Sequence, residues 1–290
     1  MLTIFSLPKA FTGIYKIIQE NAVASWAALE PKPNIILFGN DAGTKSIAQK
    51  YNSTHIPDIE CSEIGTPYVS YLFKKAASIA KTDYICFINS DIILDPNLLD
   101  VIKVAQTKSD KSLLISKRWE TNLNTEINFL DNNWFSKVVK ITKQTGAIGP
   151  FSAIDLFIFP KDLFANMPQL SIGHPGAKYD NWMIYHAKAN NHKVFDLTES
   201  ITIIHQNHPI RLFNDFSSEK AKEHMTNLKQ VGGYGYCFDI YDADFVITKD
   251  RKIIKVNFST AQFLKKIKRL LQRLVDPIRL KLPWIDLPIK

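Results

Sequence analysis

A carboxylate interrupts an apolar run at residues 83–94, DYICFINSDIIL. Asp91 stands where a run typical of a buried strand stops, and apolar residues resume directly after it. In an open α/β sheet, ligands bind beyond the carboxyl ends of the strands. A carboxylate at that edge could hold Mg²⁺ or Mn²⁺, since these ions prefer oxygen ligands and can bridge to a diphosphate. The alternative is a turn residue, because Asp-Pro at 95–96 favours a turn nearby.

Polar residues also follow the two strand-like runs that come earlier in the chain. The run LTIFSLP leaves through Pro8 and Thr12, and NIILFGND ends in Asp41. Neither the GxGxxG pattern of dinucleotide binding nor the GxxxxGK[ST] phosphate loop occurs in the sequence. A phosphorylated ligand at this edge would therefore be held differently, for example through a metal bound by an aspartate.

The segment from 171 to 210 carries a second set of candidates. A loop rich in Gly and Pro precedes Asp180, which could cap a helix or accept a proton from an attacking hydroxyl group. His205 ends a strand-like run and His208 follows three residues later. Both imidazoles could ligate a metal, although this spacing off a strand fixes no geometry. His205 could equally be a hydrogen-bonded structural residue.

Three further residues could contact a sugar or a nucleotide. Asp155 lies between apolar residues, and strand alternation points it away from their face. A buried carboxylate needs a partner or a role. Arg118, followed by Trp119, offers a cation and a stacking surface, whereas Trp182 is better explained as a core residue.

The elements that must position these residues alternate between strands and helices. Apolar spacing predicts a helix after the first strand-like run, another after the second, and a third opened by Gly65-Thr66-Pro67, with Thr66 as its cap. Later strands are expected in SLLIS, FSAIDLFIF and ESITIIH, and a helix in DNWMIYHAKANN. Alternation of this kind predicts an α/β fold with a mostly parallel sheet flanked by helices.

This ordered series resembles the GT-A glycosyltransferases, which are nucleotide-sugar-dependent enzymes with a Rossmann-like fold. YICFINSDIIL is similar to their hhhhDxD motif, which binds a metal and the diphosphate of the donor, except that Asn89 takes the first acidic position. ILFGND falls where that family commonly has an acidic residue that contacts the nucleoside. The resemblance covers roughly residues 1–257 and implies a GT-A Rossmann-like mixed, mostly parallel sheet.

The resemblance also implies roles for the candidate residues. Asp91 and His205 would hold Mn²⁺ or Mg²⁺, and Asp180 would deprotonate the acceptor hydroxyl in an inverting transfer. The residues expected at the donor site are Pro8, Thr12, Asp41, Gly65, Asn89 and Asp91, and those expected at the substrate site are Asp155, Arg118 and Trp182. Residues 1–105 would bind the nucleotide, and residues 106–257 would bind a glycan or a lipid-linked glycan, as in polysaccharide biosynthesis.

Asn89 keeps other functions open. An asparagine offers an oxygen to a metal or a ribose but no charge. The chain could therefore be a catalytically inactive GT-A-like binding or assembly subunit at a membrane surface. A nucleotidyltransferase would share the fold class but would require a glycine- and arginine-rich loop after the first strand, and SLPKAFTG is a poor one.

The net charge of +8 is concentrated at the C-terminal end, where residues 251–290 carry +9 and the remainder carries −1. Residues 258–290 form a basic tail in which STAQFLKKIKRLLQRLVDPI has the spacing of an amphipathic helix, begun by Ser259 or Thr260 and ended near Pro277. Helices of this type lie on anionic membranes, so we expect residues 259–282 to be able to contact such a surface. The alternative is packing on the body or on a second subunit. No specific nucleic acid is expected as a partner.

The remaining features bound the setting of the protein. A chain of 290 residues with 46% hydrophobic residues can bury a large core, and no apolar run reaches the ~18 residues that span a bilayer. Three cysteines without CxxC spacing predict reduced thiols, and the N-terminus lacks a basic signal-peptide region. We expect a cytoplasmic protein that can bind peripherally to the inner face of the membrane.

Overall fold

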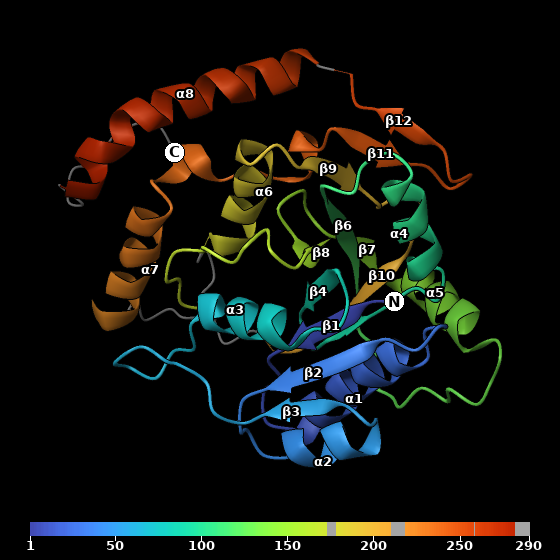
Figure 1. The fold of residues 1–290 in the computed structure, drawn as a ribbon. Coiled ribbons are helices and arrows are strands. Elements are labelled where there is room, and N and C mark those ends of the chain that lie inside the picture. Colours follow the sequence, from blue (N-terminus) through green and yellow to red (C-terminus); the bar gives the residue numbers. More distant parts are fainter. Residues whose placement is uncertain (173–177, 210–217, 258, 282–290) are drawn as a thin grey trace.

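The computed structural model describes residues 1–172, 178–209, 218–257 and 259–281 (Figure 1). The strands in these residues are β1 (Thr3–Ser6), β2 (Asn34–Phe38), β3 (Thr54–Ile56), β4 (Tyr84–Ile88), β5 (Ile92–Ile93), β6 (Ser112–Thr121), β7 (Ala147–Ile148), β8 (Ile154–Pro160), β9 (Lys193–Asp196), β10 (Ile203–Gln206), β11 (Phe245–Ile247) and β12 (Ile253–Lys255). The helices are α1 (Gly13–Ala27), α2 (Thr44–Lys50), α3 (Val69–Ile79), α4 (Leu98–Gln106), α5 (Trp134–Thr145), α6 (Tyr179–Ala189), α7 (Ser218–Gln230) and α8 (Thr260–Lys281).

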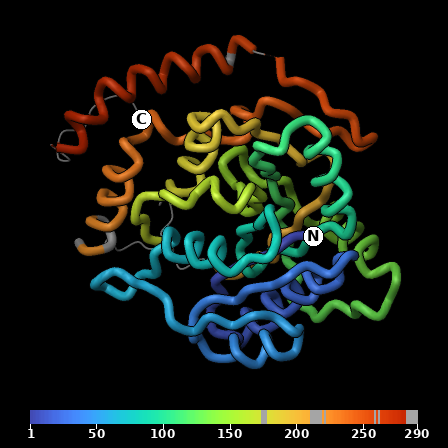
Figure 2. Tube along the Cα trace, in the orientation of Figure 1, coloured from blue at the N-terminus to red at the C-terminus, as the bar shows by residue number. Residues whose placement is uncertain are grey.

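Both halves of the chain contribute to one mixed sheet, in the order β12-β11-β9-β6-β8-β4-β1-β2-β3. Strands β4, β1, β2 and β3 run parallel to one another, while β8 is antiparallel to both β4 and β6. Strand β10 leaves this path and pairs with β5 and β6. The predicted α/β fold with a mostly parallel sheet is confirmed, and Figure 2 shows how the blue to green N-terminal half and the yellow to red C-terminal part form one body.

The residues of β4 show why helices cover both faces of the sheet. Cys86 and Ile88 belong to the core that includes α1 and α4, whereas Ile85 and Phe87 belong to the core that includes α3 and α6. A strand buried on both faces is apolar at every position. This explains the unbroken YICFI run, which carries the chain to Asp91 at the edge of the sheet.

The third predicted helix begins later than expected. Thr66 was predicted to cap it, but α3 begins at Val69 after the extended residue Tyr68. Thr66 Oγ1 instead donates to Glu223 Oε2 of α7 at 2.8 Å. The Thr66 hydroxyl group, which the local sequence predicts to cap α3, therefore hydrogen-bonds to α7 instead.

The start of α8 is as predicted, but its end is not. Ser259 Oγ accepts from the backbone N–H of Gln262 at 3.2 Å, and Gln262 Oε1 accepts from the backbone N–H of Ser259 at 2.7 Å, which forms a capping box. The helix then continues through Pro277 to Lys281. The Asp276 side chain, which accepts from Gly235 N at 2.9 Å, fixes this turn to the body and so favours helix beyond the proline.

Candidate active site

Asp91 lies just past the carboxyl end of β4, and β10 brings two histidines to it. Strand β10 runs antiparallel to the two-residue β5, with His205 opposite Ile92. The backbone carbonyl of Asp91 accepts from Gln206 N at 3.2 Å and from Gln206 Nε2 at 3.1 Å. As a result, Asp91 Oδ2 lies 3.2 Å from His208 Nε2 and 3.6 Å from His205 Nε2. One carboxylate and two imidazoles converge on one point.

The second nitrogen of each imidazole is held by a polar group outside this cluster. His205 Nδ1 lies 3.3 Å from Asn207 Oδ1, and His208 Nδ1 lies 3.4 Å from the hydroxyl group of Tyr15 on α1. Metal-ligating histidines are usually oriented by such outer contacts at the nitrogen that does not bind the metal. Both Nε2 atoms are therefore directed toward Asp91.

The electrostatics of the cluster suit a divalent cation. Burial alone would raise the pKa of Asp91, but hydrogen bonds from His205 and His208 hold it well below its usual range. Burial alone would lower the pKa of His205, but Asp91 raises it on balance. Asp91 Oδ1 is buried without a hydrogen-bond partner among the described residues, and the three ligand atoms lie within 4.8 Å of one another. A divalent cation would satisfy this oxygen.

Asn89 connects the cluster to a second polar group. Asn89 Nδ2 donates to Asp155 Oδ1 at 2.7 Å, and Asp155 forms an ion pair with Arg118. Arg118 also pairs with Glu120 at 2.9 Å. Burial raises the pKa of Asp155, Arg118 opposes this rise, and the charge of Asp91 adds to it. Asp155 and Arg118, which the sequence suggested separately, are therefore partners that lie within electrostatic reach of the cluster.

Asp180 lies in the first turn of α6, after Lys178, whose φ is +62°. Its Oδ1 accepts from the backbone N–H of Asn181 at 2.8 Å. Burial raises the pKa of Asp180 to about 6, and the charge of Asp155 contributes to the rise. At neutral pH such a carboxylate is ionised and more basic than an exposed aspartate, which is what a proton acceptor requires.

The loop after β1 is joined to the Asp91 segment through α1. Gln19 Oε1 accepts from Lys9 N at 2.7 Å and from Ser90 Oγ at 2.7 Å. The Pro8 to Thr12 loop therefore lies at the same sheet edge as Asp91. This arrangement leaves the loop after β1 on the side of the cluster where a nucleotide was expected to bind.

The other predicted donor and substrate residues lie in different surroundings. Asp41 is exposed in the loop after β2, which hydrogen-bonds to the loop after β1. Gly65 lies in an exposed turn, where its N–H donates to Ser62 O at 2.9 Å. Trp182 of α6 is 6% exposed and belongs to the core that includes α3 residues, as the core interpretation predicted. No contact of Gly65 or Trp182 within the described residues joins them to Asp91.

Sequence reasoning placed Asp91 and His205 in a metal site but did not assign His208 to it. The spacing of the two histidines was visible, yet only the pairing of β10 with β5 fixes their geometry. Tyr15 and Gln19 were also missed. They are four residues apart on α1 and so share one face of the helix, which is the signal that could have identified them.

Comparison with known proteins shows a likeness in fold. No family model and no curated protein matches the sequence. The structure of S. aureus TarS 1–349 in complex with UDP-GlcNAc is 15% identical, with a TM-score of 0.53, and the match covers 95% of this chain and 73% of TarS 1–349. M. tuberculosis glucosyl-3-phosphoglycerate synthase in complex with Mn²⁺ and UDP-glucose is 13% identical, with a TM-score of 0.49, and the match covers 89% of this chain and 87% of that one. The chain has the GT-A fold of nucleotide-sugar glycosyltransferases.

Proposed function

We propose that the chain is a metal-dependent glycosyltransferase that moves a sugar, such as a hexose, from a nucleotide-diphospho-sugar to a hydroxyl acceptor. The observation that carries this proposal is the cluster of Asp91, His205 and His208 at the carboxyl edge of a GT-A sheet. Bound there, Mn²⁺ or Mg²⁺ would neutralise charge on the departing diphosphate. In this proposal the imidazole of His208 is an additional metal ligand, which compensates for the charge that Asn89 does not offer.

The nucleotide-sugar donor would lie between the cluster of Asp91, His205 and His208 and the strands β6 and β8, which carry Arg118 and Asp155. Three hydrogen bonds to Asp155 and Glu120 use three of the five N–H groups of Arg118. The other two, which make no hydrogen bond to the described residues, can donate to a sugar or phosphate oxygen. The loop from Pro8 to Thr12, together with Asp41, would contact the nucleoside. In this proposal residues 1–105 bind the donor and residues 106–257 bind the acceptor.

Asp180 would act as the proton acceptor. The acceptor oxygen forms a bond to the anomeric carbon while the bond from that carbon to the diphosphate oxygen breaks, and the hydroxyl proton passes to a carboxylate oxygen of Asp180. Attack from the side opposite the leaving group inverts the configuration of the anomeric carbon. Burial supports this role because it makes the carboxylate a stronger base.

The proposed acceptor is a glycan or a lipid-linked glycan, and the proposed location is the cytoplasmic face of a membrane. Two features support a lipid-linked acceptor. Exposed apolar side chains gather on α8, and this helix packs beside the segment that holds the start of α6. Both features are consistent with a role in polysaccharide biosynthesis.

A thermal-denaturation panel of nucleotide diphosphates and their sugars, with and without Mn²⁺, tests the proposal. Because the TarS complex contains UDP-GlcNAc, UDP-sugars are the first donors to include. We expect a UDP-sugar with Mn²⁺ to raise the Tm, and the D91A variant to lose the part of that rise that depends on Mn²⁺. Release of nucleotide diphosphate then tests turnover. If the nucleotide-sugar binds but no nucleotide diphosphate is released, whether an acceptor is present or absent, the result would favour the catalytically inactive binding subunit instead.

A further inference from the structure

Helix α8 packs on the body through its polar face, on which Arg269, Gln272 and Asp276 are buried. Figure 1 shows the helix along the outside of the fold, near α7. Arg269 is 8% exposed, pairs with Asp242 at 2.7 Å and lies 4.2 Å from the ring centre of Phe238. Asp276 is fully buried, and Lys265 forms an ion pair with the body as well. A surface helix normally buries its apolar side, so the orientation of α8 is the reverse of the usual one.

The surface beneath α8 is shaped for this polar face. A Cβ atom added at Gly235 would lie 2.5 Å from Arg273 Cγ and 2.8 Å from the carbonyl oxygen of Arg269. Arg273 Nε also donates to the carbonyl oxygen of Gly235 at 3.0 Å. The absence of a side chain at Gly235 lets the backbone of the body approach the helix closely. The reversed orientation therefore follows from a specific fit.

The apolar side of α8 faces outward. Its exposed apolar residues follow steps of one, three and four residues, which place them on one side of the helix. They are Phe263, Leu264, Ile267, Leu270, Leu271, Leu274 and Ile278. Leu274 alone is 73% exposed. We call this set the apolar stripe. Contiguous exposed apolar residues of this kind mark an interaction surface.

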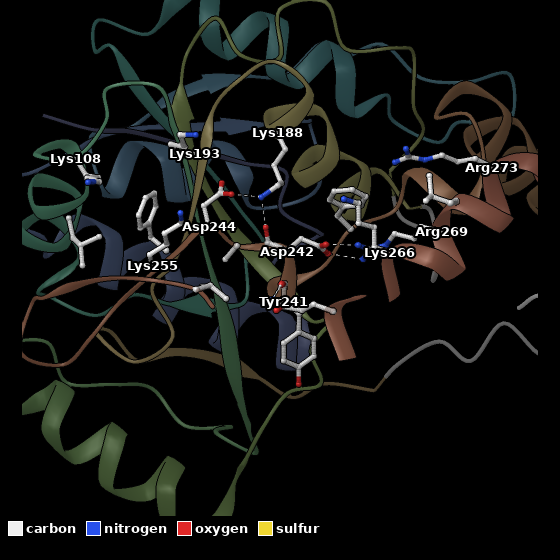
Figure 3. A pocket seen from close by; sticks show the side chains of 17 residues that line it. Lys108, Lys188, Lys193, Tyr241, Asp242, Asp244, Lys255, Lys266, Arg269 and Arg273 are labelled. Carbon is white, nitrogen blue, oxygen red and sulfur yellow. Dashed lines mark hydrogen bonds and ion pairs between the residues drawn. The ribbon is translucent and has the colours of Figure 1, made fainter. Parts of the chain in front are cut away.

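Positive charge surrounds the apolar stripe. Lys266 and Lys268 are exposed and flank it on opposite sides at helical spacing. Beside Lys266 and Leu270 opens a cavity of about 750 Å³, shown in Figure 3. Seven of the residues that line it are Lys or Arg and two are Asp. An apolar strip bordered by cations matches the boundary between acyl chains and phosphate groups at an anionic lipid surface.

We propose that α8 docks the protein on an anionic lipid bilayer. The apolar stripe lies among the upper acyl chains, while Lys266, Lys268 and the basic cavity meet the lipid phosphates. Such a helix lies in the plane of the surface. Among the helices of the described residues, none has both the length and the apolar character that a bilayer crossing requires.

Docking through α8 would bring the acceptor side of the site to the bilayer. Arg269 lies on the ring of Phe238, and the backbone of Phe238 exchanges hydrogen bonds of 3.0 Å and 2.8 Å with Asn181. Asn181 directly follows Asp180, the proposed proton acceptor. A short chain of contacts therefore connects the membrane-facing helix to the start of α6. This consequence, unlike the docking itself, rests on the proposed function.

Sedimentation with vesicles tests the docking directly. We expect the wild-type protein to bind vesicles that contain phosphatidylglycerol and to bind pure phosphatidylcholine weakly. The variant L271E/L274E should lose vesicle binding, since it places two charges in the apolar stripe. The variant L130E is the matched control, because Leu130 is 94% exposed and lies before α5, away from the stripe. The variant K266Q/K268Q should bind about 25-fold more weakly, at roughly fivefold for each lysine near an anionic surface.

Several results would overturn the docking. They are failure of the wild-type protein to bind, equal binding to both kinds of vesicle, and unchanged binding by L271E/L274E. A wild-type dimer in analytical ultracentrifugation without lipid, dissociated by L271E/L274E, would assign the stripe to a second copy of the chain. Circular dichroism checks the fold of each variant. If L271E/L274E is unstable, K266Q/K268Q tests the docking in its place, because it retains the apolar stripe. The assay uses no sugar donor, so it can fail or succeed independently of glycosyl transfer.

Discussion

Replacing Asp180 with asparagine should raise the stability of the protein while it removes the proposed activity. Burial raises the pKa of Asp180 from an ordinary value of 3.8 to about 6. A carboxyl group with a raised folded-state pKa contributes stability that is fully present below its unfolded pKa and is lost as pH rises through the folded one. The free energy of unfolding of the wild-type protein should therefore fall, through this residue, between about pH 4 and pH 7.

The size of the effect follows from the shift of about two pKa units, at 1.36 kcal/mol for each unit. At pH 8 the D180N variant should be more stable than the wild-type protein by up to about 3 kcal/mol, because the amide avoids the desolvation of a buried charge. Its amide oxygen can still accept from the backbone N–H of Asn181. For a chain of this length, such a gain raises the Tm by about 5 °C.

Thermal melts of both proteins from pH 4 to pH 8, together with sugar-transfer rates, provide the assay. We expect the two melting curves to meet near pH 4 and to separate as pH rises. The turnover of D180N should fall by about 10²- to 10⁴-fold, as for the loss of a general base. In the wild-type protein, kcat/KM should rise with pH, reach half of its maximum near pH 6 and level off above about pH 7. The D100N variant is the charge control, since Asp100 is 68% exposed on α4. A stability difference independent of pH, or a fully active D180N, would refute the reasoning.

Three other predictions follow from the geometry of the site. H208A should weaken Mn²⁺ binding in calorimetry by more than the roughly 10- to 100-fold lost with an outer contact; unchanged affinity would remove His208 from the ligand set. N89D should lower the Tm increasingly as pH rises, because a second carboxylate would replace the amide that donates to Asp155 at 2.7 Å; a Tm shift that does not vary with pH would contradict this. G43A should lower the free energy of unfolding by about 1 to 3 kcal/mol in urea denaturation, because Gly43 has a φ of +91° and a Cβ there would lie 2.7 Å from Phe11 Cβ. A midpoint equal to that of the wild-type protein would show that the loop adjusts.

Local patterns were sufficient to predict the first half of the fold. Strands β1, β2 and β4 are mostly buried runs followed within two residues by Pro8, Gly39 or Asn89, and the helices between the strands have apolar residues at helical spacing. These signals lie within a few residues of the elements that they define. The position of Asp91 at the sheet edge followed from them, because the polar end of each parallel strand lies at that edge.

Long-range pairing determines what the sequence did not reveal. The ion pair of Asp155 with Arg118 depends on β8 lying antiparallel between β4 and β6, and His208 reaches Asp91 only through the two-residue strand β5. Neither pairing has a local signature. The sequence left the packing of α8 open between a membrane surface, the body and a second subunit, because an amphipathic pattern does not say what covers its apolar side. The reversal depends on Asp242, Asp276 and Gly235, whose contacts only the folded chain brings together.

The pairing of β5 with β10 has a consequence for how the protein folds during synthesis. Asp91 and Gln206 are hydrogen-bonded although they are 115 residues apart in the chain. While the polypeptide leaves the ribosome, its early portion carries a solitary carboxylate, and the imidazole partners arrive only when β10 is synthesised. A cation captured at that moment would tie late residues to early ones, since binding energy at a site made by folding is also folding energy. Chelator added during refolding should therefore slow the association of the N-terminal and C-terminal portions, and this effect can be measured without the proposed sugar transfer.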